Sequence, residues 1–354
     1  MMRIDQLTES LAKVKVDAFI LSRPSNIYYF TGSISGGILL LAQGVEPLLL
    51  APTVNFAIAK TQASACQVKS YTREGLTAMI ADELDKVAPK TIGYDYLNLE
   101  FYERLRKKLN AELKLSADLV WSMRRIKDPE EQRIMSRAGE LADIGMEAVR
   151  ESLKAGIREY EVAADSAYAM MRNSAEGLAF STIVASGPRS AYPHAGVTER
   201  RIKKGDLVTI DLGASYKGYK SDITRTFIIG NPTGKQENIY ETVLQAYNLA
   251  FPEFKDGADG KYVDMVARAI IENAGFGERF VHSLGHGVGL EVHEPPSLSK
   301  KSKDKLRTGN VVTNEPGIYI PKFGGVRIED TVLLTDLDPV RLTNFDRNLD
   351  TMCV

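Results

Sequence analysis

The chain has 354 residues, of which 44% are hydrophobic and 26% charged, a composition that excludes a disordered or fibrous protein. Its length is enough for two ordinary domains. The formal net charge is −1 with the two signs interspersed, so we expect no nucleic-acid partner and no membrane partner. The two cysteines lie in unrelated contexts, and the first residues form an amphipathic pattern instead of a signal peptide. These features predict a cytoplasmic protein.

The first 122 residues alternate predicted helices with short apolar strands. Helices are predicted near residues 3–15, 53–63, 75–88 and 99–109, and strands at 17–22, 36–42, 46–52, 67–72 and 91–96. The alternation predicts a small α/β domain over residues 1–122.

The segment RRIKDPEEQRIM marks the junction with the second domain. Asp128 suits the N-cap, Pro129 suits the first helical position, and Glu131 stands where a capping box requires an acid. We therefore predict a long amphipathic helix from here to about Lys154, and a second helix over residues 159–173.

From Phe180 onward the sequence predicts several strands in addition to helices. Strands are predicted at residues 181–187, 206–214, 221–230, 311–320 and 326–335, and helices at 235–250 and 261–274. Strand groups and helix pairs occur on both sides of residue 255. This pattern predicts an α+β domain over residues 123–354 with internal two-fold repetition.

Two predicted hairpins each carry a pair of acids in apolar strands. A turn centred between Tyr216 and Lys217 places Asp211 opposite Asp222, with their Cβ atoms roughly 4.5–5.5 Å apart. A loop centred on Lys322 places Glu315 opposite Glu329 in the same way. The four acids of the two hairpins are Asp211, Asp222, Glu315 and Glu329.

Two interpretations of these acids compete. They could be ordinary hairpin-end residues that are solvated or paired with Lys217, Lys220, Arg225 or Arg327. Facing carboxylates among apolar neighbours instead require a cation between them, and two such pairs favour metal coordination. Four acids and an imidazole suit Mn²⁺ or Co²⁺, with Fe²⁺ or Zn²⁺ as alternatives. They are too many for one catalytic ion and suit two ions about 3.5–4 Å apart.

Three of the four histidines lie in HSLGHGVGLEVHE, at His282, His286 and His293, and the fourth is His194. The glycines of this segment argue against a helical zinc site and indicate backbone that runs close to a site. If VGLEVHE is extended, Gly289, Glu291 and His293 share one face. A lone histidine is more often structural than functional, but here all four lie near the acid-bearing strands.

These residues resemble the metal ligands of the pita-bread metallopeptidases, the family that includes prolidase, aminopeptidase P and methionine aminopeptidase. The matching stretches are IDLGASYKGYKSDITRTF, HSLGHGVGLEVHE, EPGIYI and GGVRIEDTVLLT. The N-terminal part with NIYYFTG is similar to the extra domain of prolidase and aminopeptidase P. The resemblance implies a creatinase/aminopeptidase-like catalytic domain with pseudo-two-fold symmetry, a smaller α/β domain before it, and a homodimer.

The resemblance also implies roles for the site residues. Asp211 would bind one of two divalent ions, His286 and Glu315 the other, and Asp222 and Glu329 would bridge them. Glu315 would act as the general base, and His293 would help to stabilise the oxyanion. The general acid for the proline nitrogen would come from the neighbourhood of His194, His293 and Arg327, and His282 would line the pocket with His293 and handle substrate and protons.

The implied substrates are small peptides with proline at position two, and their length is open. A dipeptidase must bind a free carboxylate just after the proline, which calls for a cation. Some prolidases that resemble this chain have an arginine where this sequence has Ser297. The alternatives are a broader-specificity aminopeptidase of the same fold and a non-catalytic binding protein that retains it.

Overall fold

A six-stranded mixed sheet organises the first of two units into which the computed structural model, described over residues 2–354, divides. This unit is Met1–Met123, and its strands lie in the order β4-β3-β2-β1-β5-β6. The strands are β1 (Ala18–Leu21), β2 (Ile38–Ala42), β3 (Val45–Pro52), β4 (Gln67–Tyr71), β5 (Thr91–Tyr94) and β6 (Glu112–Leu115). The helices are α1 (Arg3–Lys13), α2 (Pro24–Thr31), α3 (Phe56–Gln62), α4 (Leu76–Asp85), α5 (Leu99–Arg106) and α6 (Ala117–Arg124).

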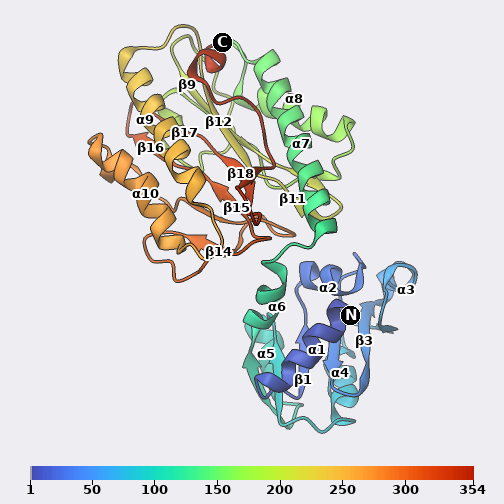
Figure 1. Ribbon diagram of the computed structural model, residues 1–354. Helices are drawn as coiled ribbons and strands as arrows, with labels where there is room; N and C mark the ends of the chain where they lie inside the picture. Colours follow the sequence, from blue (N-terminus) through green and yellow to red (C-terminus); the bar gives the residue numbers. More distant parts are fainter. Residues whose placement is uncertain (1) are drawn as a thin grey trace. The chain divides into compact units, whose positions relative to one another are not determined.

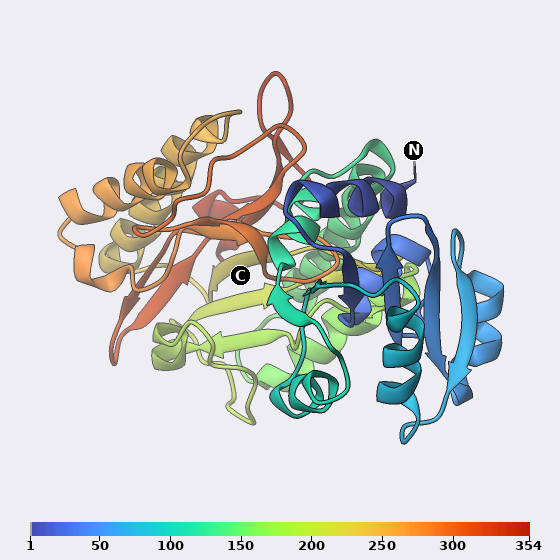
Figure 2. The ribbon, with the colours of Figure 1, turned by 90° about the horizontal axis from the view of Figure 1, so that it is seen from below.

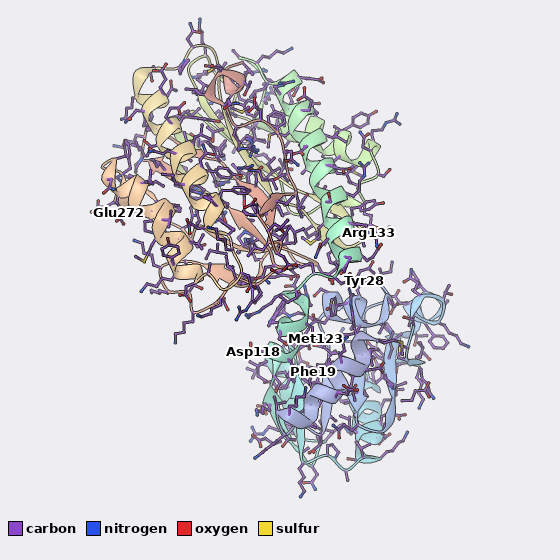
Figure 3. All side chains as sticks on the ribbon, viewed as in Figure 1. Phe19, Tyr28, Asp118, Met123, Arg133 and Glu272 are labelled. Carbon is purple, nitrogen blue, oxygen red and sulfur yellow. The ribbon has the colours of Figure 1, made fainter. Side chains whose placement is uncertain are left out.

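The central strand β1 pairs with β2 on one side and with β5 on the other, and it is buried over its whole length. Its residues AFIL are apolar throughout, as expected for a strand that is covered on both faces. Helices lie against the sheet (Figure 2), and Phe19 of β1 lies inside this unit (Figure 3).

The second unit, Arg124–Val354, contains two helix pairs and several antiparallel sheets. Figure 1 shows the pair α7 and α8 in green and the pair α9 and α10 in yellow to orange. The helices are α7 (Pro129–Ser152), α8 (Glu159–Arg172), α9 (Gly234–Ala250), α10 (Gly260–Asn273) and α11 (Leu349–Met352). The strands are β7 (Gly177–Leu178), β8 (Ile183–Ser186), β9 (Leu207–Leu212), β10 (Ala214–Tyr216), β11 (Tyr219–Lys220), β12 (Ile223–Ile228), β13 (Gly285–Gly287), β14 (Glu294–Leu298), β15 (Val311–Asn314), β16 (Gly317–Ile320), β17 (Gly324–Arg327), β18 (Asp330–Leu333) and β19 (Val340–Arg341).

The order of the elements repeats within this unit. The first helix pair precedes the sheet β12-β9-β8, and the second precedes the sheet β14-β13-β15-β18-β19. One continuous apolar core joins the halves and includes Leu141, Val208, Phe227, Val243 and Val312. Polar residues such as Arg133 of α7 and Glu272 of α10 stand on the outside (Figure 3). No helix in residues 2–354 is both long enough and apolar enough to cross a membrane.

The start of α7 has the predicted cap. The Asp128 carboxylate accepts hydrogen bonds from the backbone N–H groups of Glu130 and Glu131, both at 2.9 Å. The Glu131 carboxylate accepts one from the N–H of Asp128 at 3.0 Å, which completes the capping box. Pro129 occupies the first helical position, where its missing N–H costs no hydrogen bond.

The predicted pairing of Asp211 with Asp222 is wrong. The turn lies at Lys217 and Gly218, both with positive φ (45° and 78°), as the common two-residue hairpin turn requires. This shifts the centre of the hairpin by one residue, so that Asp211 pairs with Thr224. The second hairpin is centred on Lys322 as predicted, with Gly317 opposite Arg327.

The strands predicted at residues 311–320 and 326–335 are each broken into two. The first consists of β15 and β16, and the second of β17 and β18. The two parts belong to different sheets, because β15 pairs with β18 and β16 pairs with β17. The breaks fall at Glu315 and Glu329, two of the predicted ligands.

Candidate metal centre

A cavity of about 440 Å³ lies within the unit Arg124–Val354. Its wall contains every residue that the sequence indicated as a ligand or a catalytic group. These are Asp211, Asp222, His286, Glu315 and Glu329, together with His194, His282, His293 and Arg327. Part of the remaining wall is apolar, from Phe180, Ile183, Pro193 and Val292.

The four acids lie where the chain passes from one sheet to another. Asp211 is close to the end of β9, and Asp222 lies between β11 and β12. Glu315 directly follows β15, and Glu329 directly precedes β18. At such points the strict alternation of side chains along a strand is interrupted. Carboxylates from both halves of the unit can therefore turn toward one cavity.

Thr224 of β12 connects two of these acids. Asp211 is its partner on β9, and Glu329 forms a β-bridge with it on the other side. The N–H of Glu329 donates to the Thr224 carbonyl at 3.0 Å, and the Thr224 hydroxyl donates to Glu329 Oε2 at 2.6 Å. Asp211 and Glu329 therefore flank one residue of β12.

Arg327 is buried and donates to three partners in the site. Its Nη2 donates to Asp211 Oδ2 at 2.7 Å, its Nη1 to the Tyr319 hydroxyl at 2.8 Å, and its Nε to the Thr224 hydroxyl at 3.0 Å. The other oxygen of Asp211, Oδ1, is buried and has no hydrogen-bond partner in the described part of the chain. A buried carboxylate oxygen without a partner is costly, so this atom is suited to a cation.

The His286 ring is oriented for metal binding through Nε2. Its Nδ1 lies 3.0 Å from the carbonyl of Gly287, which can only accept, so Nδ1 carries the hydrogen. Nε2 then keeps its lone pair and lies 3.4 Å from Glu315 Oε1 and 3.7 Å from Asp222 Oδ2. Hydrogen bonding of the second ring nitrogen is the usual way in which proteins orient a histidine ligand.

The two glycines that flank His286 allow a close approach of strands. A Cβ atom on Gly285 would lie 2.1 Å from the carbonyl oxygen of Thr313, and one on Gly287 would lie 2.4 Å from that of Pro295. Neither position has room for a side chain. The glycines of this motif therefore allow β13, which carries His286, to lie between β14 and β15. His286 thus lies in a strand and not in a helix, as the sequence predicted.

The electrostatics of the cavity favour a bound cation. Burial, and then the charge of Glu329, raises the pKa of both Asp222 and Glu315. Burial and the charge of Asp211 raise the pKa of Glu329 to about 8. Arg327 opposes this effect but is a single charge among several acids. Burial lowers the pKa of His286 to about 4, which leaves the imidazole neutral and able to bind metal.

The donors present fit divalent metal. One ligand atom each from Asp222, His286 and Glu329 lie within 4.8 Å of one another. Glu315 approaches the same imidazole, and the unpaired Oδ1 of Asp211 lies in the same wall. This set of carboxylate oxygens and one imidazole nitrogen is typical of Mn²⁺, Co²⁺, Fe²⁺ and Zn²⁺ sites.

The other histidines form the surroundings of this cluster. His282 Nδ1 lies 2.7 Å from the Ser283 carbonyl, so its Nε2 accepts from the Tyr319 hydroxyl at 2.8 Å. Burial lowers the pKa of His282 to about 3 and also lowers the pKa of His293. The ring of His293 lies 4.2 Å from that of His286, centroid to centroid. His194 lines the cavity but is exposed, so it stands at the open edge.

The extended conformation considered for VGLEVHE is not observed. Residues 289–293 form bends between β13 and β14, and His293 approaches His286 because the chain folds back. A bond from the N–H of Gly289 to the carbonyl of Glu291, at 3.0 Å, helps to close this loop. With glycine at position 289, the loop also has room for the Glu294 carboxylate, which a Cβ atom there would meet at 2.7 Å.

Sequence reasoning missed Tyr319 and Thr224. Tyr319 connects Arg327 with His282, and Thr224 connects Arg327 with Glu329. Alternation along GIYI could have indicated Tyr319, because Ile318 packs in the apolar core and its neighbour must face the opposite side. Thr224 gives no comparable signal, since its role depends on a bridge between strands 105 residues apart.

A fold with these features and this set of donors defines a metallopeptidase. The chain belongs to metallopeptidase family M24, whose sequence model matches residues 133–336. The creatinase/prolidase N-terminal domain matches residues 3–126. The two units together have the creatinase/prolidase fold with its pita-bread domain, as the resemblance implied.

Several relatives are similar over nearly the full length. A Xaa-Pro dipeptidase of Pyrococcus furiosus is 42% identical over 350 residues, which cover 98% of this chain and 99% of the relative. The crystal structure of the prolidase from Pyrococcus horikoshii has a TM-score of 0.91 at 43% identity, with 98% of this chain and 99% of that chain covered. The X-Pro aminopeptidase from Thermotoga maritima has a TM-score of 0.91 at 33% identity, with 99% of each chain covered.

Proposed function

We propose that this chain is a Xaa-Pro peptidase that uses two divalent metal ions, with Mn²⁺ or Co²⁺ expected before Zn²⁺ or Fe²⁺. The observation that carries the proposal is the convergence of four carboxylates and one oriented imidazole on a single cavity, where Asp211 Oδ1 is buried and finds no hydrogen-bond partner in the described part of the chain. The specificity for proline rests on the names of the relatives, which are Xaa-Pro dipeptidases and an X-Pro aminopeptidase.

In this proposal the five donors divide between two ions. Asp211 would hold one ion, His286 and Glu315 the other, and Asp222 and Glu329 would be shared. When bound, the ions would activate a water nucleophile and polarise the carbonyl that precedes proline. Arg327 would hold Asp211 in place through its bond to Oδ2 and leave Oδ1 for metal.

The chain's own groups would handle the protons. Glu315 would take the proton of the nucleophile on a carboxylate oxygen, because burial and the charge of Glu329 raise its pKa and so make the carboxylate a stronger base. His293, whose pKa is lowered by burial, would donate a ring N–H to the developing oxyanion. The proline nitrogen has no hydrogen and leaves only when protonated, and His194 at the open edge would supply this proton.

The apolar part of the wall suits the proline ring. Phe180, Ile183 and Val292 lie in the same cavity as the acids and histidines. Burial of a pyrrolidine ring against such side chains is favourable by roughly 25 cal/mol per Å² of apolar surface. A residue with a charged side chain at this position would lose that contribution.

Substrates longer than dipeptides are the second candidate. Among described side chains that line the cavity, the cationic or potentially cationic ones are Arg327 and the four histidines. Arg327 is already bonded to Asp211, Tyr319 and Thr224, and burial keeps His282 and His286 neutral. Among the described wall residues this leaves His194 and His293 for a free carboxylate directly after proline, and the proposed catalytic roles engage both, which favours peptides that continue beyond it.

We also propose a cytoplasmic homodimer. Both cysteines, Cys66 and Cys353, are free thiols, which suits a reducing compartment. Light scattering of the purified protein would test the dimer, and a mass of one 354-residue chain would contradict it.

One experiment tests the peptidase proposal. The protein would be purified, its metal content measured, and kcat/KM compared for Ala-Pro, Ala-Pro-Ala and Ala-Ala-Ala with Mn²⁺ or Co²⁺. We expect metal-dependent cleavage of at least one proline substrate and little cleavage of Ala-Ala-Ala. Equal cleavage of all three would favour a broader aminopeptidase. Absence of both bound metal and cleavage would favour a non-catalytic protein with this fold.

A further inference from the structure

The segment that carries His194 is attached to the domain by a buried acid and an arginine outside the metal cluster. Glu159 is the first residue of α8 and has no exposed surface. Arg189 lies in the 3₁₀ helix Gly187–Ala191, which leads into the segment. Neither residue lines the cavity.

Glu159 accepts hydrogen bonds from both ends of the loop. Its Oε1 accepts from the N–H and the hydroxyl of Ser186, at 2.9 and 2.7 Å. Its Oε2 accepts from the N–H and the hydroxyl of Thr198, at 3.0 and 2.6 Å. Arg189 Nη1 also donates to Oε2. The carboxylate thus connects the residues before and after His194 and, at the first turn of α8, is favoured by the helix dipole.

Arg189 holds the loop at the residue that follows His194. Its Nη2 donates to the carbonyl of Ala195 at 2.6 Å, while Nη1 binds Glu159. In the described chain, these bonds and those of Thr198 are the hydrogen bonds that attach residues 193–199 to the rest of the domain. Tyr192 and Val197 are 64% and 42% exposed, so packing adds little restraint at these positions.

We propose that Glu159 and Arg189 form a positioning pair that holds residues 192–198 so that His194 faces the cavity. They act through the loop and touch neither the substrate nor the metal ligands. A fork of two N–H groups is needed, because one arm must bind a carboxylate and the other a carbonyl. The kinetic consequence rests on the proposed peptidase function, whereas the structural consequence does not.

Arg189→Lys is the informative variant, because it keeps a positive charge beside Glu159 but cannot bind Ala195 at the same time. We expect faster amide hydrogen exchange in residues 193–199, unchanged exchange in α8, and a loss of kcat/KM of about tenfold from misplacement of His194. In a His194→Ala background the same change should alter kcat/KM by less than about twofold, because that variant has no imidazole left for the loop to position.

Arg137→Lys is the matched control. Arg137 likewise binds one carboxylate, that of Glu140, and one backbone carbonyl, that of Asn173, but it lies on α7 outside the cavity wall. The Arg137→Lys variant should leave kcat/KM and the amide exchange of residues 193–199 unchanged. Thr198→Val removes one hydroxyl contact without affecting the ion pair, and it should give a weaker form of the same result if Arg189→Lys does not fold.

Two outcomes would overturn the proposal. One is unchanged exchange of residues 193–199 in both Arg189→Lys and Thr198→Val. The other is an Arg189→Lys effect on kcat/KM that is as large without His194 as with it. If the wild-type protein cleaves no proline peptide but exchange still rises in the variants, the positioning pair stands and the proposed function is wrong.

Discussion

Arg327 Nη2 lies 2.7 Å from Oδ2 of Asp211, and this contact leaves Oδ1 of the same carboxylate buried, with no hydrogen-bond partner among residues 2–354. The two oxygens of this side chain therefore have different roles. Oδ2 fixes the orientation of the carboxylate through the ion pair, and Oδ1 remains available to bind a cation. A buried arginine is suited to this because it stays charged at all physiological pH values.

Glu315→Gln tests the proton-transfer role. The amide preserves shape but cannot accept the proton of the nucleophile, so we expect kcat on proline peptides to fall about 10²- to 10⁴-fold. The assay should use saturating Mn²⁺ with the bound metal measured, because Glu315 is also a proposed ligand. Glu176→Gln, at an exposed acid off the cavity wall, is the control. Near-normal turnover of Glu315→Gln with metal bound would remove this role.

The sequence predicted well the features that depend only on residues close together in the chain. The cap of α7 depends on Asp128, Pro129 and Glu131, which are neighbours in the chain and sufficient by themselves. The register of the hairpin around Lys217 was harder to predict, because the choice between two adjacent turn positions depends on which residues adopt positive φ. A shift of one residue there changed the partner of Asp211 from Asp222 to Thr224.

The breaks at Glu315 and Glu329 were beyond what local patterns could show. Apolar residues continue on both sides, so each stretch was predicted as one strand. The chain nevertheless changes sheet at these acids, because β15 pairs with β18 while β16 pairs with β17. Pairing between distant strands decided the result, as it did for the bridge between Thr224 and Glu329. The four acids stood out because carboxylates are unusual in such apolar strands, and the resemblance to the pita-bread metallopeptidases added His286 as the fifth predicted ligand.

Tyr319→Phe tests the connection between Arg327 and His282. The hydroxyl accepts from Arg327 and donates to His282, so its removal leaves a buried donor and a buried acceptor unpaired. We expect kcat/KM to fall about tenfold while metal content stays unchanged. Tyr240→Phe is the matched control, since this buried hydroxyl donates to the Arg347 carbonyl away from the site. Equal losses in the two variants would indicate a general effect on stability.

Removal of metal should make stability depend on pH. Burial and Asp211 raise the pKa of Glu329 from its ordinary 4.5 to about 8, so between these values the folded protein keeps a proton that the unfolded chain has released. The folded state then binds more protons, and its stability falls as pH rises. The lowered pKa values of His282 and His286 act in the opposite direction but only below 6.5.

The measurement is therefore the Tm between pH 6.5 and 8, with a chelator and with saturating Mn²⁺. The Tm of the chelated protein should fall across this range, by roughly 2–4 °C for each kcal/mol lost. With metal bound, cations replace the protons among the acids, and the Tm should change little. Parallel Tm curves with and without metal would contradict the proposed ligand set.

Ser297→Arg tests what limits the length of the substrate. Ser297 lines the cavity from β14, and its N–H donates to Asp304 at 2.9 Å, which fixes the backbone at this point. An arginine here would present a fork to a carboxylate directly after proline. We expect kcat/KM for Ala-Pro to rise about tenfold relative to Ala-Pro-Ala, which corresponds to about 1.4 kcal/mol. Ser299→Arg places the same charge two residues along the chain and off the wall, so it should leave the ratio unchanged. If Ser297→Arg also leaves the ratio unchanged, the free carboxylate is bound elsewhere, and the cations of the cavity wall do not set the substrate length.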